Sequence, residues 1–185
     1  MSELRTNRIV PRDGLASGMS GGIIQIVHKD YRDFFSTTAL IPLDDTIPQN
    51  TEGEEVFTQA ITPTRSDSKI FITCVLNISN SNASNLHTAA IFRDSVANSI
   101  AAGWAKCVGT NAPSSPMVIN FLDSPSTTSA VTYKVRVGYS AGSSSTVQVN
   151  GGSGTRYLGG ALASGMTLME VCLLYTLTLP TKRIV

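Results

Sequence analysis

Apolar and polar residues alternate along much of the chain with a period of two. The clearest run lies in residues 131–139, and a second one lies in residues 70–78. The apolar positions are Val131, Tyr133, Val135, Val137 and Tyr139 in the first run, and Ile70, Ile72, Cys74, Leu76 and Ile78 in the second. Because successive side chains of a strand point to opposite faces, this period predicts strands with one apolar face and one wet face, as in an antiparallel sheet.

Shorter β-branched or apolar runs between turn residues predict further strands. They cover residues 23–28, 35–41, 56–62, 86–92, 117–122, 146–150 and 166–174. About nine strands separated by turn signals are typical of an antiparallel β-sandwich or jelly roll. The best helical segment is 96–106, where Val96, Ile100 and Trp104 follow a spacing of four, but Gly103 and the short length weaken it. The sequence therefore predicts an all-β fold with at most one helical turn.

The first 22 residues do not have the pattern of a globular element. Residues 4–11 could form an extended segment, and residues 13–22 contain the Gly and Ser residues of turns and hinges. We predict an attachment arm and joint in residues 1–22, a β-sandwich domain in 23–171 and a C-terminal extension in 172–185. Leu4, Ile9 and Val10 would be the apolar anchors of the arm. Arg5 and Arg8 would make polar contacts with the partner.

Composition narrows the classes of function. Charged residues make up 15% of the chain, below the roughly 25% usual for soluble domains, and the net charge is +1. With no basic excess to neutralise phosphates, nucleic-acid binding is not expected. A polar but weakly charged surface is typical of many extracellular and virion β-proteins.

The cysteines and the hydropathy of the chain indicate in which cellular compartment it folds and whether it enters a membrane. Cys74, Cys107 and Cys172 are odd in number and lack zinc-site spacing, which favours folding in a reducing cytoplasm with Cys74 and Cys172 packed as small hydrophobic residues. No apolar signal sequence precedes Ile23. The most apolar segment, residues 166–179, is too short to span a bilayer and contains Glu170, so no membrane insertion is expected.

No catalytic, cofactor-binding or metal-binding residue is predicted. The G-x-S-x-G match at residues 18–22 lacks the strand–turn–helix context of a nucleophile elbow, and His28 and His87 both lie in strand-like runs. A loose acidic cluster could bind calcium, but a solvated loop is the preferred interpretation. That cluster consists of Asp44, Asp45, Glu52, Glu54 and Glu55.

Two long segments, 94–116 and 141–165, are rich in small residues and are expected to be loops. The first contains the single tryptophan, Trp104, close to Lys106. Such a tryptophan can stack on a sugar or anchor a protein contact, or it can simply pack beneath its loop. Trp104 and Lys106 are the candidate receptor-facing residues.

Several segments resemble the small tail-fibre-like proteins of tailed phages, those of cyanobacteria in particular. They are residues 4–14, 20–27, 61–70, 91–94, 121–126, 131–135 and 164–171. The order of these short segments along the chain carries the resemblance. It implies a non-enzymatic, homotrimeric β-sandwich knob on the outer surface of a virion, made in the host cytoplasm and released by lysis.

Three classes of function stay open at this point. The resemblance favours a tail fibre or receptor-binding knob that contacts other virion proteins through its arm and a host cell-surface receptor or glycan through its loops. The chain continues for fourteen residues past Val171 and has no repetitive shaft, which leaves a capsid decoration protein as the alternative. An enzyme such as a depolymerase is disfavoured, because no acid, base or nucleophile constellation is visible.

Overall fold

The structure is a computed structural model that describes residues 22–82, 85–107, 115–141 and 144–172. These residues form strands and one short 3-10 turn at Leu158–Gly160, and no α-helix occurs among them, so the all-β prediction is confirmed. The strands are β1 (Gly22–Tyr31), β2 (Phe35–Thr37), β3 (Glu54–Ile61), β4 (Lys69–Asn80), β5 (Leu86–Arg93), β6 (Ala101–Lys106), β7 (Ser115–Asp123), β8 (Val131–Ala141), β9 (Val147–Val149), β10 (Gly151–Gly152), β11 (Thr155–Arg156) and β12 (Ser164–Cys172).

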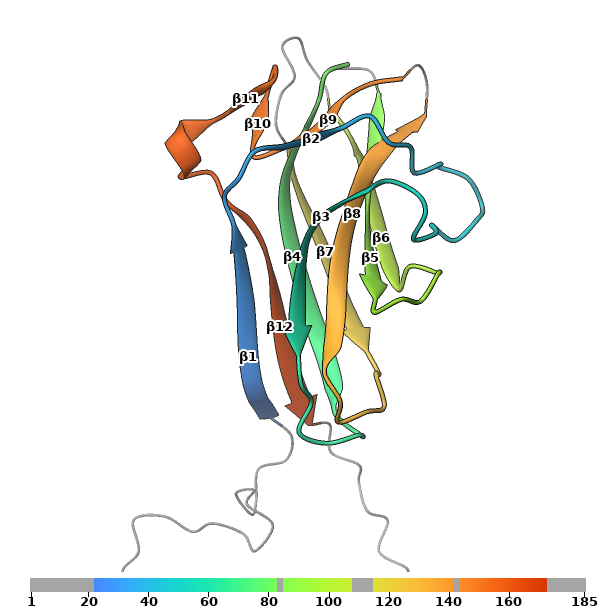
Figure 1. Ribbon diagram of the computed structural model, residues 1–185, viewed down its shortest axis with the longest axis vertical. Coiled ribbons are helices and arrows are strands. Elements are labelled where there is room, and N and C mark those ends of the chain that lie inside the picture. Colours follow the sequence, from blue (N-terminus) through green and yellow to red (C-terminus); the bar gives the residue numbers. More distant parts are fainter. Residues whose placement is uncertain (1–21, 83–84, 108–114, 142–143, 173–185) are drawn as a thin grey trace, which may run out of the picture.

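Eight of these strands form a jelly roll. They pair antiparallel as nested couples, β1 with β12, β3 with β8, β4 with β7, and β5 with β6. The couples alternate between a first sheet, β1-β12-β4-β7, and a second sheet, β3-β8-β5-β6 (Figure 1). The short strands β9 and β2 extend the first sheet beyond the end of β4. The predicted antiparallel, jelly-roll-like sandwich is therefore confirmed.

The core lies between the two sheets and follows the alternation in the sequence. On β4, Ile70, Ile72, Cys74, Leu76 and Ile78 have no exposed surface. On β8, Val131, Tyr133, Val135 and Val137 are buried, and Tyr139 is partly buried against the same core. Burial raises the pKa of the Cys74 thiol to about 12. Cys74 thus packs as a small hydrophobic residue, as expected.

The segment predicted as loop or helical turn contains strand β6, which corrects the sequence interpretation. Residues Ala101–Lys106 pair with β5, and their side chains alternate between half-buried and exposed. Ala101, Gly103 and Ala105 form the inward side, and a Cβ on Gly103 would lie 3.3 Å from Ile119 Cγ1 of β7. Small residues are needed for this close approach, and pairing with β5 overrides the weak helical spacing.

Residues 38–53 cover part of the outer face of the second sheet, although part of this segment was predicted to continue a strand from Phe35. Strand β2 ends at Thr37, and Ile41 packs on Ala90 and Phe92 in a small separate core. The Ile41 N–H donates to the Tyr139 carbonyl at 2.9 Å. A Cβ on Gly138 would lie 2.7 Å from the Ala39 carbonyl oxygen, so the covering segment requires glycine there.

A buried carboxylate fastens β12 to β1 and to the turn before β4. Glu170 accepts hydrogen bonds from Gln25 Nε2 at 2.7 Å and from the Thr64 N–H and hydroxyl at 2.8 Å each. Burial raises the pKa of Glu170, but hydrogen bonds that include those from Gln25 and Thr64 outweigh it, so the net pKa lies below the ordinary value. The folded state therefore favours the ionised form.

Glu170→Gln should destabilise the fold at neutral pH by about 2 kcal/mol, because an amide cannot replace a charged acceptor of several hydrogen bonds. Since the folded pKa is lowered, this stabilisation is complete above the ordinary Glu pKa of about 4.3 and disappears as pH falls through the lower folded value. Thermal unfolding from pH 7 to pH 3 should show the gap between wild type and variant closing on the acid side. If the stability difference between wild type and variant stays constant down to pH 3, Glu170 does not stabilise the fold in its ionised form.

Candidate functional site

Trp104 and Lys106 lie on β6, the edge strand of the second sheet, and not on a loop as predicted. Both side chains point outward, and 58% of Trp104 is exposed. Of the two interpretations left open by the sequence, packing beneath the chain is therefore wrong. An exposed tryptophan on a rigid strand is positioned to contact a partner.

These two residues lie toward the end of the sandwich opposite to the two ends of the described chain. Gly22 opens β1 and pairs with Cys172, the last residue of β12, at the lower end of Figure 1. Lys106 pairs with Leu86, the first residue of β5, near the upper end. The domain thus has one end where the chain enters and leaves, and a distant end that carries Trp104.

The strands next to Trp104 are well anchored to one another. Thr88 is the register partner of both Trp104 and Gly138, and its hydroxyl lies 2.5 Å from the Ser140 hydroxyl. Leu43, 43% exposed, donates its N–H to the Ser140 carbonyl at 3.3 Å. Thr88 and Ser140 are each only 4% exposed, so their hydroxyl pair anchors β5 to β8, and Trp104 is the group exposed for a contact.

The predicted arm residues Leu4, Arg5, Arg8, Ile9 and Val10 lie outside the described residues. The same is true of the glycine-rich stretch 18–21 and of residues 173–185. The attachment role of residues 1–22 therefore stays a prediction.

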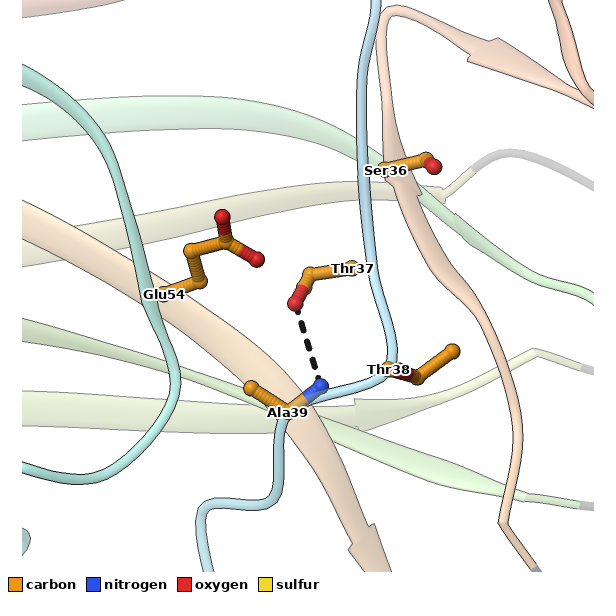
Figure 2. A pocket seen from close by; sticks show the side chains of 5 residues that line it. All are labelled: Ser36, Thr37, Thr38, Ala39 and Glu54. Carbon is orange, nitrogen blue, oxygen red and sulfur yellow. Dashed lines mark hydrogen bonds between the residues drawn. The ribbon is translucent and has the colours of Figure 1, made fainter.

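A hollow of about 450 Å³ lies where the segment after β2 passes the start of β3. It is lined by Ser36, Thr37, Thr38, Ala39 and Glu54 (Figure 2). The Thr37 hydroxyl accepts a hydrogen bond from the Ala39 N–H at 3.0 Å. Glu54 is the one ionisable lining residue, so the hollow can hydrogen-bond a ligand but has no acid–base pair.

A buried histidine and cysteine approach each other but are not arranged for catalysis. His87 Nδ1 lies 3.8 Å from Cys107 Sγ. Burial lowers the pKa of His87 to about 4 and raises the pKa of the Cys107 thiol. At neutral pH both groups are uncharged, whereas a nucleophilic cysteine needs thiolate character. The pair fills the core rather than a reaction site.

The acidic cluster predicted as a solvated loop serves local hydrogen bonding. Asp44 accepts from the Thr46 N–H at 2.8 Å, and Glu52 accepts from the Gln49 N–H at 2.9 Å. Among the residues that the structure describes, no group of three His, Cys, Asp or Glu side chains could hold a metal ion. In the same part of the chain, no helix is long and apolar enough to cross a membrane.

The outer face of the first sheet is an apolar surface, and in the sequence only the apolar run of residues 166–179 pointed toward it. We call it the first-sheet outer face. The alternation favours apolar residues at inward positions, but here the outward positions are also apolar. Its apolar members are Ile23 and Ile26 on β1, Met169 and Val171 on β12, Phe71 and Val75 on β4, and Val118 and Leu122 on β7.

Comparison with known proteins gives likenesses of fold only. No protein-family model and no curated protein matches the chain. The structure of Eiger TNF from S. frugiperda aligns at a TM-score of 0.40 with 7% identity, over 84% of this chain and 98% of that chain. The structure of infectious bursal disease virus Gt strain aligns at 0.39 with 16% identity, over 89% of this chain and 43% of that chain.

The VP2 subviral particle of infectious bursal disease virus aligns at a TM-score of 0.39 with 12% identity, over 92% of this chain and 43% of that chain. The present chain thus spans less than half the length of these viral chains. At TM-scores of 0.39 and 0.40, these likenesses assign no function to it.

Proposed function

We propose that this chain is a non-enzymatic structural protein of a tailed-phage virion, of the receptor-binding knob type. The observation that carries the proposal is the one-ended geometry of the jelly roll. The chain enters at Gly22 and leaves at Cys172 at one end, and the exposed Trp104 lies toward the other. A protein attached to a particle through one end presents its opposite end to the surroundings.

Two further observations support this proposal. The weakly charged, polar composition is typical of virion β-proteins, and the segments that resemble phage tail-fibre-like proteins lie mostly within strands and turns of the sandwich. The titratable groups of the described core are arranged for packing, as His87 and Cys107 illustrate, which supports a non-enzymatic role. The proposal includes a homotrimer on the virion surface, made in the host cytoplasm.

Capsid decoration is the second candidate, because attachment through one end of the jelly roll also suits a protein that coats a capsid. The two candidates differ in copy number. Quantitative gel analysis of purified particles should give tens of copies for a fibre and hundreds for a decoration protein. Absence of the chain from purified particles would overturn both.

Trp104→Ala should weaken adsorption of the purified protein to host cells by about tenfold or more, because exposed tryptophans are frequent binding hot spots. The thermal midpoint should change little, because Trp104 lies 58% exposed on an edge strand. Leu158→Ala is a matched control, since Leu158 is 74% exposed elsewhere on the surface. Unchanged adsorption of the Trp104 variant would remove Trp104 from the receptor-facing site.

A further inference from the structure

We propose that the first-sheet outer face is the surface through which copies of this chain pack against one another. The threefold stoichiometry rests on the proposed function, whereas the location of the contact rests on the side chains of the face itself.

One row of side chains crosses the whole face without a polar residue. Ile26 of β1 pairs with Met169 of β12, which pairs with Phe71 of β4, which pairs with Leu122 of β7. Ile26 is 56% exposed and Leu122 is 44% exposed. Contact of these four aligned apolar side chains with water is unfavourable. A partner that covers them would remove this apolar surface from water, which favours association.

Two further rows, one on each side, add apolar residues to the face. Val75 of β4 pairs with Val118 of β7, which is 55% exposed, and Ile23 of β1 pairs with Val171 of β12. Between these rows lies a row of uncharged or weakly basic hydrogen-bonding groups. It consists of His28, Thr167, Thr73 and Asn120.

The second sheet shows what the chain does with an outer face that stays within one copy. There, residues 38–53 bury Ala90 and Phe92 beneath Ile41. Arg136 of β8 donates to the carbonyls of Glu52 and Gly53 in the same segment, and further along β8 the outward residues are Thr132 and Lys134, which are suited to water. Among the described residues, the outer face of the second sheet is thus largely covered or charged, whereas the outer face of the first sheet stays apolar, which favours a partner as its cover.

The charges of the face favour another copy of the same chain as that partner. Asp30, at one end, is paired with Arg32 at 2.6 Å, and Lys69, at the other end, donates to Ser124 at 2.7 Å. Between them the face carries no carboxylate and no lysine or arginine among the described residues. A charged partner would find no opposite charge there, whereas an uncharged apolar face can meet itself without repulsion.

The size of the face fits a stable contact. Four strands and five outward rows of β4 cover on the order of 600 Å² from the usual strand spacing and rise per residue. Each partner in a standard interface contributes roughly 800 Å². The face therefore approaches the area that stable association requires.

A hollow on the β1 side of the face could receive a neighbour's side chain. It has a volume of about 170 Å³, and Gly165 lies in its lining between Asp30 of β1 and Val75 of β4. A Cβ on Gly165 would lie 2.6 Å from the Lys29 carbonyl, so glycine is required there. In a closed ring, the β7 side of one copy meets the β1 side of the next, which would bring Val118 or Leu122 toward this region.

The orientation follows from the ends of the chain. Gly22 and Cys172 lie at one end of the strands that form the face. If the symmetry axis runs along the strands, all copies place these ends together, as attachment to one particle requires. A twofold axis in the plane of the face but across the strands would send them in opposite directions.

The test compares Ile26→Asp with Ile47→Asp in the full chain. Ile26 is 56% exposed on the first-sheet outer face, and Ile47 is 53% exposed on the segment that covers the second sheet. Both variants replace an isoleucine of similar exposure by aspartate, so they differ only in their location on the domain. Val118→Asp, at 55% exposure on β7, repeats the test on the other side of the face.

Light scattering of the purified wild type should give about three times the 19.6 kDa chain mass. Ile26→Asp and Val118→Asp should give a monomer or raise the dissociation constant at least about 100-fold, because an unpaired carboxylate would be buried. Ile47→Asp should keep the wild-type mass, and the circular-dichroism spectra of all variants should show the folded β-sandwich of the wild type.

A wild type that is monomeric at about 100 µM, or an Ile47→Asp variant that dissociates as readily as Ile26→Asp, would overturn the proposal. A dimer that Ile26→Asp dissociates would support the face and contradict threefold symmetry. Because these measurements need no particle, they can succeed even if the chain proves absent from virions, and the two failures are distinguishable.

Discussion

Asp123→Ala should lower the free energy of unfolding by about 3 kcal/mol, because it removes one partner of a buried charged cluster. Asp123 on β7 is 6% exposed. It accepts from Arg93 Nη1 at 2.9 and 3.0 Å and from the Tyr133 hydroxyl at 2.7 Å. Arg93 is on β5 and Tyr133 on β8, so this carboxylate joins the first sheet to the second.

The loss has two parts. Without Asp123, the Arg93 guanidinium keeps only partial access to water, since its side chain is 28% exposed. The Tyr133 hydroxyl is fully buried and would lose its acceptor. Burial and then the hydrogen bond to Asp123 raise the pKa of Tyr133, so it is a neutral donor at neutral pH. An unsatisfied buried hydroxyl alone costs about 1–3 kcal/mol.

Urea unfolding measures the effect, with two controls. Asp67→Ala breaks the exposed pair between Asp67 and Arg65 and should leave the urea midpoint almost unchanged, because exposed ion pairs contribute little. Tyr133→Phe removes only the hydroxyl and should cost about 1 kcal/mol. If Asp123→Ala were as mild as Asp67→Ala, the cluster would not fasten the two sheets.

The sequence predicts the central strands well because one physical rule decides them. On β4 and β8 the inward positions are all apolar and the outward ones mixed, so period two is visible over nine residues in each strand. The nested pairing of the strands is non-local and leaves no trace in the spacing of residues. Only the number of strands and the turn signals pointed to a sandwich or jelly roll.

The two errors have a common cause. Strand β6 contains Ala and Gly on its inward side, so it lacks the apolar signal of a strand, and its partner β5 determines its conformation. Ile41 looks like the end of a strand, but its burial comes from Ala90 and Phe92, which are distant in sequence. In both places a tertiary contact decides the structure.

The candidate surfaces were predictable only in part. Trp104 was found because the chain has a single tryptophan, whereas its exposure on an edge strand is a property of the fold. The first-sheet outer face joins residues from four strands that are up to about 150 positions apart, such as Ile23 and Val171, as the sheet pairing requires. The sequence indicates this apolar face only at β12, where apolar residues occupy both faces of the strand.

Deleting residues 1–21 should leave the sandwich folded and abolish its incorporation into particles. The paired strands and both cores of the described structure are built from residues 22–172, so removal of the arm costs none of these contacts. The thermal midpoint of the truncated protein should therefore stay within a few degrees of wild type. Incorporation should fall at least about tenfold if Leu4, Ile9 and Val10 are the apolar anchors.

Incorporation is measured as the amount of the chain in purified particles after complementation of a phage that lacks it. Leu4→Asp combined with Val10→Asp in the full chain separates loss of the anchors from loss of length. Arg12→Ala, just beyond the proposed anchors, is the control and should incorporate normally. A truncated protein that is folded and still joins particles at the wild-type level would show that attachment occurs elsewhere. In that case the end carrying Gly22 and Cys172 would have to face a partner through its own turns, such as the 62–68 turn that Glu170 holds in place.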